Sequence, residues 1–279
     1  MNVYVIARLT FMEASRRKIL LAALILGLVF LLIFGLGFYF MINDLRKYRE
    51  GIVIINTVSN FLLMAGLYVV NFLTSIMTVL TSVDTLSGEI SSGTVHTIVS
   101  KPVRRWEVVI GKWLGFVVMI SLYLLLMAGG VIGSIYAITG YLPPNPFLGI
   151  VFMWLNALLL LSISMWGGTF LSTLANGVLV FGLYGLAFLG GWIEQLGAFF
   201  QEPARSTALN LGVLTSLLMP SEALWRRAAH ELSSPLTSAF GFSPFSSSIY
   251  PSMLMVVYAV LYLLVIVFLA LRKFQQRDL

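Results

Sequence analysis

The sequence alternates long apolar runs with short polar connections. Six of these runs are long enough to cross a membrane, and they cover residues 19–42, 58–83, 113–139, 148–174, 177–199 and 252–271. Each is near or above the roughly 20 residues that a helix needs to span the hydrocarbon core. Backbone groups in lipid must find partners within their own segment, and the alternation of a barrel strand is absent. The pattern therefore predicts an all-α integral membrane protein with one six-helix bundle over residues 1–279.

Proline, asparagine and glycine mark the short connections between the predicted helices. The stretch TGYLPPNPF at 139–147 holds three prolines, which lack the N–H donor that a helix interior needs. Asn176-Gly177 is typical of a turn and separates the fourth run from the fifth. We therefore expect the chain to reverse at these two places.

Residues 200–251 do not fit the pattern of a spanning helix. The apolar stretch 206–219 has about 14 residues, which favours an interfacial or re-entrant segment. The following stretch, SEALWRRAAHEL at 221–232, places an apolar face opposite Glu222 and Arg226, which are spaced as an i,i+4 ion pair. The apolar face consists of Trp225, Ala228, Ala229 and Leu232. We expect a helix lying flat on the outer surface, with a poorly ordered loop as the alternative.

Composition supports an integral membrane protein. Hydrophobic residues make up 59% of the chain and charged residues only 10%, with a mean hydropathy of +0.97. Soluble domains carry roughly 25% charged residues. The first apolar run is about twice as long as the apolar region of a signal peptide, so it is expected to remain as an anchor. The absence of cysteine excludes disulfides and thiolate chemistry.

The distribution of Lys and Arg predicts the orientation. Eleven lie in the N-terminal arm, the loop at 84–112 and the C-terminal tail, whereas six lie on the opposite face. By the positive-inside rule, both termini and the loop at 84–112 are expected in the cytoplasm, and the protein in the cell membrane. The net charge of +6 then reflects membrane topology and anionic lipid rather than nucleic-acid binding.

Residues that could support catalysis or metal binding are scarce. His230-Glu231-Leu232-Ser233-Ser234 lacks the second histidine of a zinc protease motif, and the chain has only one other histidine, His96. Gly111-Lys112 is followed by Trp113, so a P-loop is not formed. Glu194 is the one ionisable residue within the predicted spans, and its place beside Trp192 favours an interfacial anchor over a proton carrier. We expect no catalytic residue, no metal site and no cofactor in this chain.

The loop at 84–112 concentrates seven charges, and the 81 residues after it carry none. Gly88 and Gly93 interrupt the helix that leaves the second span, and Pro102 starts an element that continues into the third span. The pattern predicts a helix, a break and a second helix. A solvated loop whose basic residues only fix the topology is the alternative.

The polar residues of this loop resemble the signature of type 2 ATP-binding-cassette (ABC) permeases. The matching positions are Glu89, Gly93, Thr94, Lys101, Pro102, Arg105, Gly111 and Lys112. The resemblance implies that the loop forms a cytoplasmic coupling helix on a separate ATPase, that the N-terminal arm is an elbow helix, and that ATP and Mg are bound by the ATPase. It also implies a dimer, either of this chain or with a similar permease, carrying two ATPase copies. Within the family, the chain is similar to the copper-processing permease of nitrous oxide reductase maturation, and no residue singles out that branch.

This resemblance leads to a hypothesis about individual side chains. Glu89, Lys101, Arg104 and Arg105 are expected to make polar contacts that shape the coupling element or bind it to the ATPase. ATP-driven closure of two ATPase subunits can move the spans only through a stiff element that touches them. The loop at 84–112 is the largest charged candidate in the sequence.

A polar stripe follows the second predicted span. It consists of Asn60, Tyr68, Asn71, Ser75, Thr78 and Ser82. Such a face should avoid lipid, and it either lines a substrate path or makes hydrogen bonds between helices. The lack of charge favours a hydrophobic or amphipathic substrate. Two small-residue pairs, Gly111 with Gly115 and Gly129 with Gly133, would permit close helix approach.

Together these observations predict the membrane subunit of an ABC transporter that acts as an exporter. The alternative is a transmitter that uses ATPase strokes to drive an extracytoplasmic partner, with residues 200–251 as the docking surface. A membrane-embedded enzyme or an ion-coupled carrier is disfavoured by the missing ionisable groups. Substrate identity, transport direction and the choice between homodimer and heterodimer are not encoded in any motif that we recognise.

Overall fold

The computed structural model of the protein describes residues 3–48, 51–88, 104–197, 199–234, 245 and 250–276. Within this part of the chain, six helices are long and apolar enough to cross a membrane. They are α2 (Lys18–Lys47), α3 (Ile52–Ser82), α6 (Arg105–Thr139), α7 (Pro146–Gly168), α8 (Thr173–Gly197) and α12 (Met253–Gln275). The prediction of an all-helical six-span membrane protein is confirmed.

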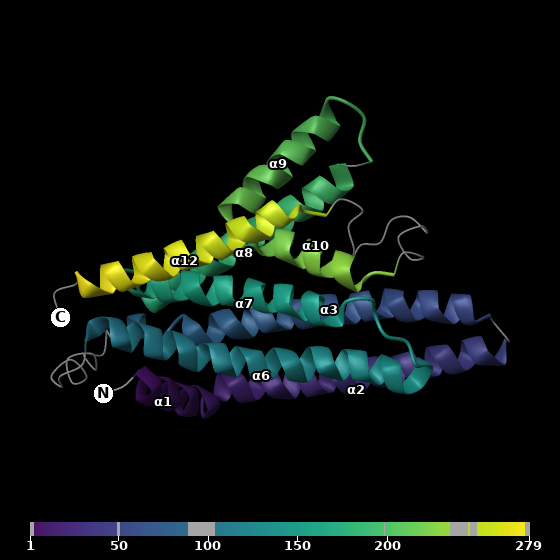
Figure 1. Ribbon diagram of the computed structural model, residues 1–279, viewed down its shortest axis with the longest axis horizontal. Coiled ribbons are helices and arrows are strands. Elements are labelled where there is room, and N and C mark those ends of the chain that lie inside the picture. Colours follow the sequence, from purple (N-terminus) through teal and green to yellow (C-terminus); the bar gives the residue numbers. More distant parts are fainter. Residues whose placement is uncertain are drawn as a thin grey trace.

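The described part of the chain holds three further helices beside the six spans. α1 (Val3–Ser15) packs along the beginning of α6, and α9 (Ala204–Leu218) turns back along α8. α10 (Ser221–Leu232) packs against α7 and α8. Figure 1 shows that α1 begins and α12 ends at one end of the bundle, whereas α9 projects from its side. We refer to the end that holds the start of α1 and the end of α12 as the terminal end.

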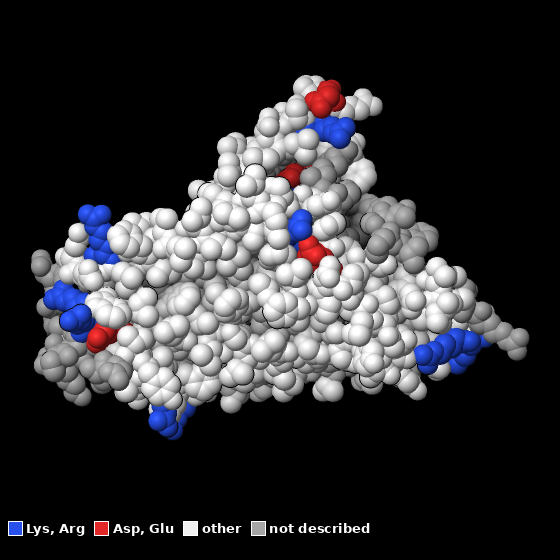
Figure 2. All heavy atoms as spheres, viewed as in Figure 1, with Lys and Arg blue, Asp and Glu red and all other residues white. Residues whose placement is uncertain are grey.

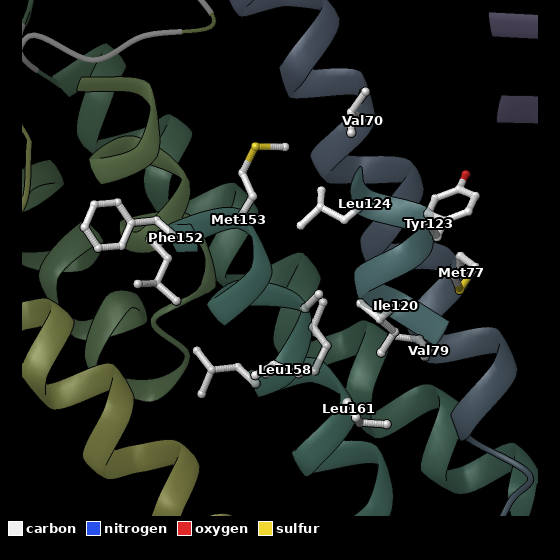
Figure 3. Packing of buried hydrophobic residues seen from close by; sticks show 14 of the residues in the cluster. Val70, Met77, Val79, Ile120, Tyr123, Leu124, Phe152, Met153, Leu158 and Leu161 are labelled. Carbon is white, nitrogen blue, oxygen red and sulfur yellow. The ribbon is translucent and has the colours of Figure 1, made fainter. Parts of the chain in front are cut away.

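The interior of the bundle is built around α7. In its most apolar 18-residue window, 67% of α7 is buried, compared with 11% of α2. Figure 3 shows buried side chains of α3, α6 and α7, and the labelled ones are Phe152, Met153, Leu158, Leu161, Val70, Met77, Val79, Ile120, Tyr123 and Leu124. α7 is therefore the central helix, and α2 is a peripheral helix whose apolar surface faces outward, as expected of a helix in contact with lipid.

The connection between α6 and α7 agrees with the sequence. α6 ends at Gly140, which adopts the left-handed conformation (φ 71°) that glycine tolerates best. α7 begins with Pro146 in its first turn, where a missing N–H donor has no cost. The chain reversal predicted within 139–147 is confirmed.

The connection between α7 and α8 lies earlier than the Asn-Gly pair predicts. α7 ends at Gly168 and α8 begins at Thr173, so Asn176 and Gly177 lie inside α8. The side-chain amide of Asn176 donates to the backbone oxygens of Val83 (3.1 Å) and Ser164 (2.9 Å). These tertiary hydrogen bonds explain why the pair is helical, because they give the buried amide partners that a turn would not provide.

The prediction that 221–232 lies flat on the outer surface is wrong. The segment is helical, but Trp225, Arg226 and Leu232 are all buried. Leu232 occupies the space left by the missing side chain of Gly149 on α7. The predicted apolar face is therefore real, and it packs into the bundle rather than onto a membrane surface. The alternative of a poorly ordered loop is also wrong for this segment.

Candidate coupling site

A polar network joins three helices at the terminal end. Arg17, at the corner between α1 and α2, donates to Glu13 (2.7 Å) and lies 3.8 Å from Asp84 just beyond α3. The other oxygen of Asp84 accepts a hydrogen bond from Thr173 at the start of α8 (3.1 Å). The hydroxyls of Ser87 and Thr173 are 3.0 Å apart. We call these residues, together with Asn176, the terminal network.

Asn176 and Ser164 extend the terminal network into the bundle. Asn176 joins α8 to the end of α3 through the backbone oxygen of Val83. Ser82 donates to Ser164 of α7 at 2.8 Å. The last turn of α3 is therefore held by α7, α8 and the corner between α1 and α2. A displacement of the chain that follows Ser87 would act on all of them.

Two glycines of α6 allow α1 to pack closely against it. A side chain at Gly111 would approach Ile6 within 2.6 Å, and one at Gly115 would approach the backbone oxygen of Ala7 within 2.7 Å. Both distances are shorter than van der Waals contact, so only glycine permits this separation of the two helices. The second predicted pair, Gly129 and Gly133, has no described neighbour within 4 Å.

Four of the predicted coupling residues lie within the described part of the chain. Arg104 precedes α6, and Arg105 donates to the backbone oxygen of Gln275 at the end of α12 (3.3 Å). Lys112 is buried, with 4% of its surface exposed. The other five, Glu89, Gly93, Thr94, Lys101 and Pro102, lie outside the described residues. α6 begins at Arg105, so the element predicted to continue into the third span is helical from that residue.

Charged residues gather at the ends of the bundle. Figure 2 shows Lys and Arg at both ends and over α9 and α10, with an uncharged band between them. The basic residues in the last turns are Arg46 and Lys47 of α2, and Arg272 and Lys273 of α12. An uncharged band flanked by basic residues is the distribution expected for a protein that spans a membrane.

The polar stripe on α3 lies in contacts between helices. Asn156 of α7 donates to Asn71 (3.1 Å) and Ser75 (3.4 Å), and Thr78 donates within its own helix to Thr74. Hydrogen bonds of this kind contribute about 0.6 kcal/mol on average in membranes. In this conformation the middle of the stripe joins α3 to α7.

The two remaining stripe residues face α8 and α10. Asn60 donates to the hydroxyl of Tyr141 (2.8 Å) and to the backbone oxygen of Leu232 (3.1 Å). The hydroxyl of Tyr68 accepts from the indole of Trp192 on α8 (3.4 Å). Asn60 therefore fixes the end of α10, and Tyr68 marks the place where α3, α8 and α10 meet.

Arg226 and Glu194 form a buried ion pair at 2.8 Å. The sequence predicts a pair between Arg226 and Glu222, but Arg226 donates to Glu194 of α8 and to Ser216 of α9 (3.4 Å). The carboxylate of Glu194 packs against the α-carbon of Gly212, where no side chain intervenes. A cavity of about 190 Å³ adjoins the pair and is lined by residues of α8, α9 and α10 and by the segment that leads into α12.

Sequence reasoning missed the partners within both groups. Asp84 and Thr173 are 89 residues apart, and Glu194 and Arg226 lie on different helices. One signal could have indicated the second pair, because a carboxylate inside an apolar span requires a compensating cation. Arg226 is the cation that the structure brings to Glu194.

One comparison with known proteins gives a match. The model of a family described as ABC-2 family transporter protein matches residues 4–279. No curated protein matches the chain. The match does not extend to the narrower similarity with the copper-processing permease.

Proposed function

Since the chain belongs to the ABC-2 transporter family and is the membrane-spanning permease subunit of an ABC transporter, we propose that it couples ATP hydrolysis by a separate ATPase to the export of an amphipathic substrate. The family implies the ATPase partner and the membrane setting. Export, the nature of the substrate and the coupling residues are part of the proposal.

The observation that carries the proposal is that the residues on both sides of the loop between α3 and α6 make hydrogen bonds to other helices. On one flank, Asp84 and Ser87 contact Thr173 of α8. On the other, Arg105 contacts the end of α12. If the ATPase moves this loop, the terminal network transmits the movement to α8 and to the corner between α1 and α2, and the hydrogen bond from Arg105 transmits it to α12.

The proposed assembly contains two permease copies and two ATPase subunits. ATP and Mg are bound by the ATPase and none by this chain. The terminal end faces the cytoplasm in this proposal, as the excess of Lys and Arg in the terminal segments favours. A dimer of this chain is the simplest assembly, because six spans are half the usual number for an ABC transporter.

The proposed path runs along α3, past Asn60, Tyr68, Asn71, Ser75 and Thr78. Asn71 and Ser75 are engaged by Asn156 in this conformation. Exposing them to a substrate would require α7 to separate from α3 during the transport cycle. Tyr68 is only partly buried and would be the first of these side chains to meet a substrate.

A transmitter that drives an extracytoplasmic partner is the second candidate. It is favoured by the packing of α10 into the bundle, since Asn60 and Gly149 hold Leu232 at the end of that helix. A movement of α3 or α7 would then reach the surface beyond α10. The burial of α10 also means that deleting residues 221–232 would damage the core. Substituting the exposed His230 is the better test of partner binding.

The experiment that tests the proposal uses the permease purified with its ATPase in lipid vesicles. We expect Arg105→Glu to reduce transport-linked ATPase activity severalfold while membrane insertion is retained. Arg205→Glu, on the exposed surface of α9, is the matched control and should leave the activity unchanged. Unchanged coupling in Arg105→Glu, or ATP hydrolysis by the permease without the ATPase, would contradict the proposal.

A further inference from the structure

Glu222, in the first turn of α10, is a carboxylate for which the described part of the chain provides no hydrogen-bond donor or ion-pair partner. Its spacing from Arg226 fits an ion pair, but the Nη1 atom of Arg226 donates to Glu194 and the Nη2 atom to Ser216. Among the described residues, no side chain donates a hydrogen bond to Glu222. A carboxylate partly withdrawn from water without a donor loses part of its hydration uncompensated, so the position calls for an explanation.

The surrounding helices place this carboxylate between α3 and α8. The side chain of Glu222 crosses α8 at Gly191, where a side chain would collide with it. The next residue of α8, Trp192, donates to the hydroxyl of Tyr68 on α3 (3.4 Å). The hydroxyls of Tyr68 and Tyr184 both lie within electrostatic reach of Glu222. The carboxylate therefore faces the side of α3 that carries the proposed path.

Aromatic residues lie close to this position, because Trp192 follows Gly191 on α8 and Trp225 lies one turn after Glu222 on α10. Tyr68 packs edge-on against Trp225, with ring centroids 5.2 Å apart, and Trp192 lies 6.2 Å from Phe188. Glu222, Tyr68, Tyr184 and Trp192 are all partly exposed, so packing does not close the group off. Aromatic faces attract cations, and quaternary ammonium groups are commonly bound by several rings together.

The charges in this region do not balance. The two carboxylates of Glu194 and Glu222 face one guanidinium, that of Arg226. The buried Oε2 atom of Glu194 also accepts no hydrogen bond within the structure. The pKa of Glu222 is raised to about 7, chiefly by burial; the charge of Arg226 opposes this rise and that of Glu194 adds to it. When Glu222 is ionised, the region is therefore short of one positive charge, and a bound cation would supply it and favour the ionised form.

We propose that Glu222, Tyr68, Tyr184 and Trp192 bind the cationic head of the exported amphiphile, an amine or quaternary ammonium group on an apolar body. The excess negative charge disfavours an anionic head. A metal cation would require several oxygen ligands, whereas one carboxylate beside aromatic rings suits an organic ammonium. The inference rests on the proposed function, because it names the substrate class for the same path.

Binding is measured on the purified permease in lipid nanodiscs, without the ATPase and without ATP. The probe is radiolabelled decyltrimethylammonium, with the uptake of empty nanodiscs subtracted. We expect saturable binding that weakens at least tenfold in Glu222→Gln and is unchanged in Glu202→Gln, a carboxylate on the exposed surface. Decanol and decyl sulfate, with the same chain and a neutral or anionic head, should compete poorly.

A second pair of variants keeps the test decisive if Glu222→Gln does not fold. Tyr68→Phe retains the ring and should bind within a factor of three of the parent, whereas Tyr68→Leu should bind about tenfold more weakly. Equal binding by both Tyr68 variants, equal binding by Glu222→Gln, or equal displacement by decanol would each overturn the proposal.

The measurement separates this inference from the proposed function. Loss of cation selectivity would overturn the binding site and leave ATP-driven export intact. Selective binding by a permease that shows no ATP-driven export in vesicles with its ATPase would support the site and contradict the exporter.

Discussion

Arg226 of α10 donates to Glu194 of α8 at 2.8 Å, with both side chains more than nine-tenths buried. The pair joins two helices that are separated in the sequence by α9. Ser216 of α9 accepts a second hydrogen bond from the same guanidinium, so one side chain connects α8, α9 and α10. This contact determines how the chain between the fifth and sixth spans is packed.

Removing one member of this pair should destabilise the protein strongly. Arg226→Met leaves the buried carboxylate of Glu194 without a counter charge, which costs about 3–5 kcal/mol of unfolding free energy. The double variant Glu194→Gln with Arg226→Met removes both charges and should recover most of the loss. Thermal unfolding in detergent measures the difference. A double variant less stable than Arg226→Met alone would contradict this account.

The same substitution at two glycines of α6 should have opposite effects. Gly115→Ala places a methyl group 2.7 Å from the backbone oxygen of Ala7, so α1 must move away and the unfolding temperature should fall. Gly129→Ala meets no described atom within 4 Å and should stabilise the helix by about 0.5–1 kcal/mol. Differential scanning fluorimetry of both variants checks the prediction, which fails if the two shifts have the same sign.

Stability should fall as the pH rises through the range in which Glu222 titrates. Its pKa is about 7 in the folded protein and 4.5 in a solvated carboxyl group, so between these values the folded protein holds a proton that the unfolded chain has released. The contribution of that proton to the free energy of unfolding is fully present below pH 4.5 and is lost as the pH rises through about 7. It amounts to about 3 kcal/mol.

The variant Glu222→Gln tests this pH dependence, because glutamine cannot release the proton. We expect its unfolding temperature to change less between pH 5 and 8 than that of the parent. Glu202→Gln is the matched control and should retain the dependence of the parent. Parallel curves for the parent and Glu222→Gln would show that other groups cause the effect.

Removing the charge of Asp84 should weaken coupling more than stability. Asp84→Asn loses the attraction to Arg17 and one acceptor for Thr173, both partly exposed contacts that contribute roughly 1 kcal/mol or less. Transport-linked ATPase activity should nevertheless fall severalfold, since Asp84 joins the end of α3 to α8. Asp44→Asn, whose partner Lys47 lies on the same helix at the opposite end, is the control. Equal activities in the two variants would count against a role for Asp84.

Hydropathy predicted the spans because the membrane requires each of them to be apolar along its length. It could not predict that α10 is buried, because the charges of Glu222, Arg226 and Arg227 are typical of a surface helix. Two of these charges are stabilised inside the protein by Glu194 and Glu231, which lie on α8 and on α10 itself. Only the tertiary structure reveals that a charged helix is buried.

The coupling site was predicted in part for a similar reason. The polar signature of the loop identified Arg105, Gly111 and Lys112, and the structure gives Gly111 a packing role against α1. The hydrogen bond from Thr173 to Asp84 joins residues from distant parts of the chain, so no local sequence pattern predicts it. The Asn-Gly pair was misleading because two distant carbonyls satisfy the amide of Asn176.

The hydrogen bond from Arg105 to the backbone oxygen of Gln275 also bears on biosynthesis. Arg105 opens the third span and Gln275 closes the sixth, 170 residues later. A ribosome delivers the third span to the membrane well before its partner exists. The proposed coupling surface is therefore completed only after the last span has been inserted, so under this proposal the order of synthesis disfavours docking of the ATPase onto an incomplete permease.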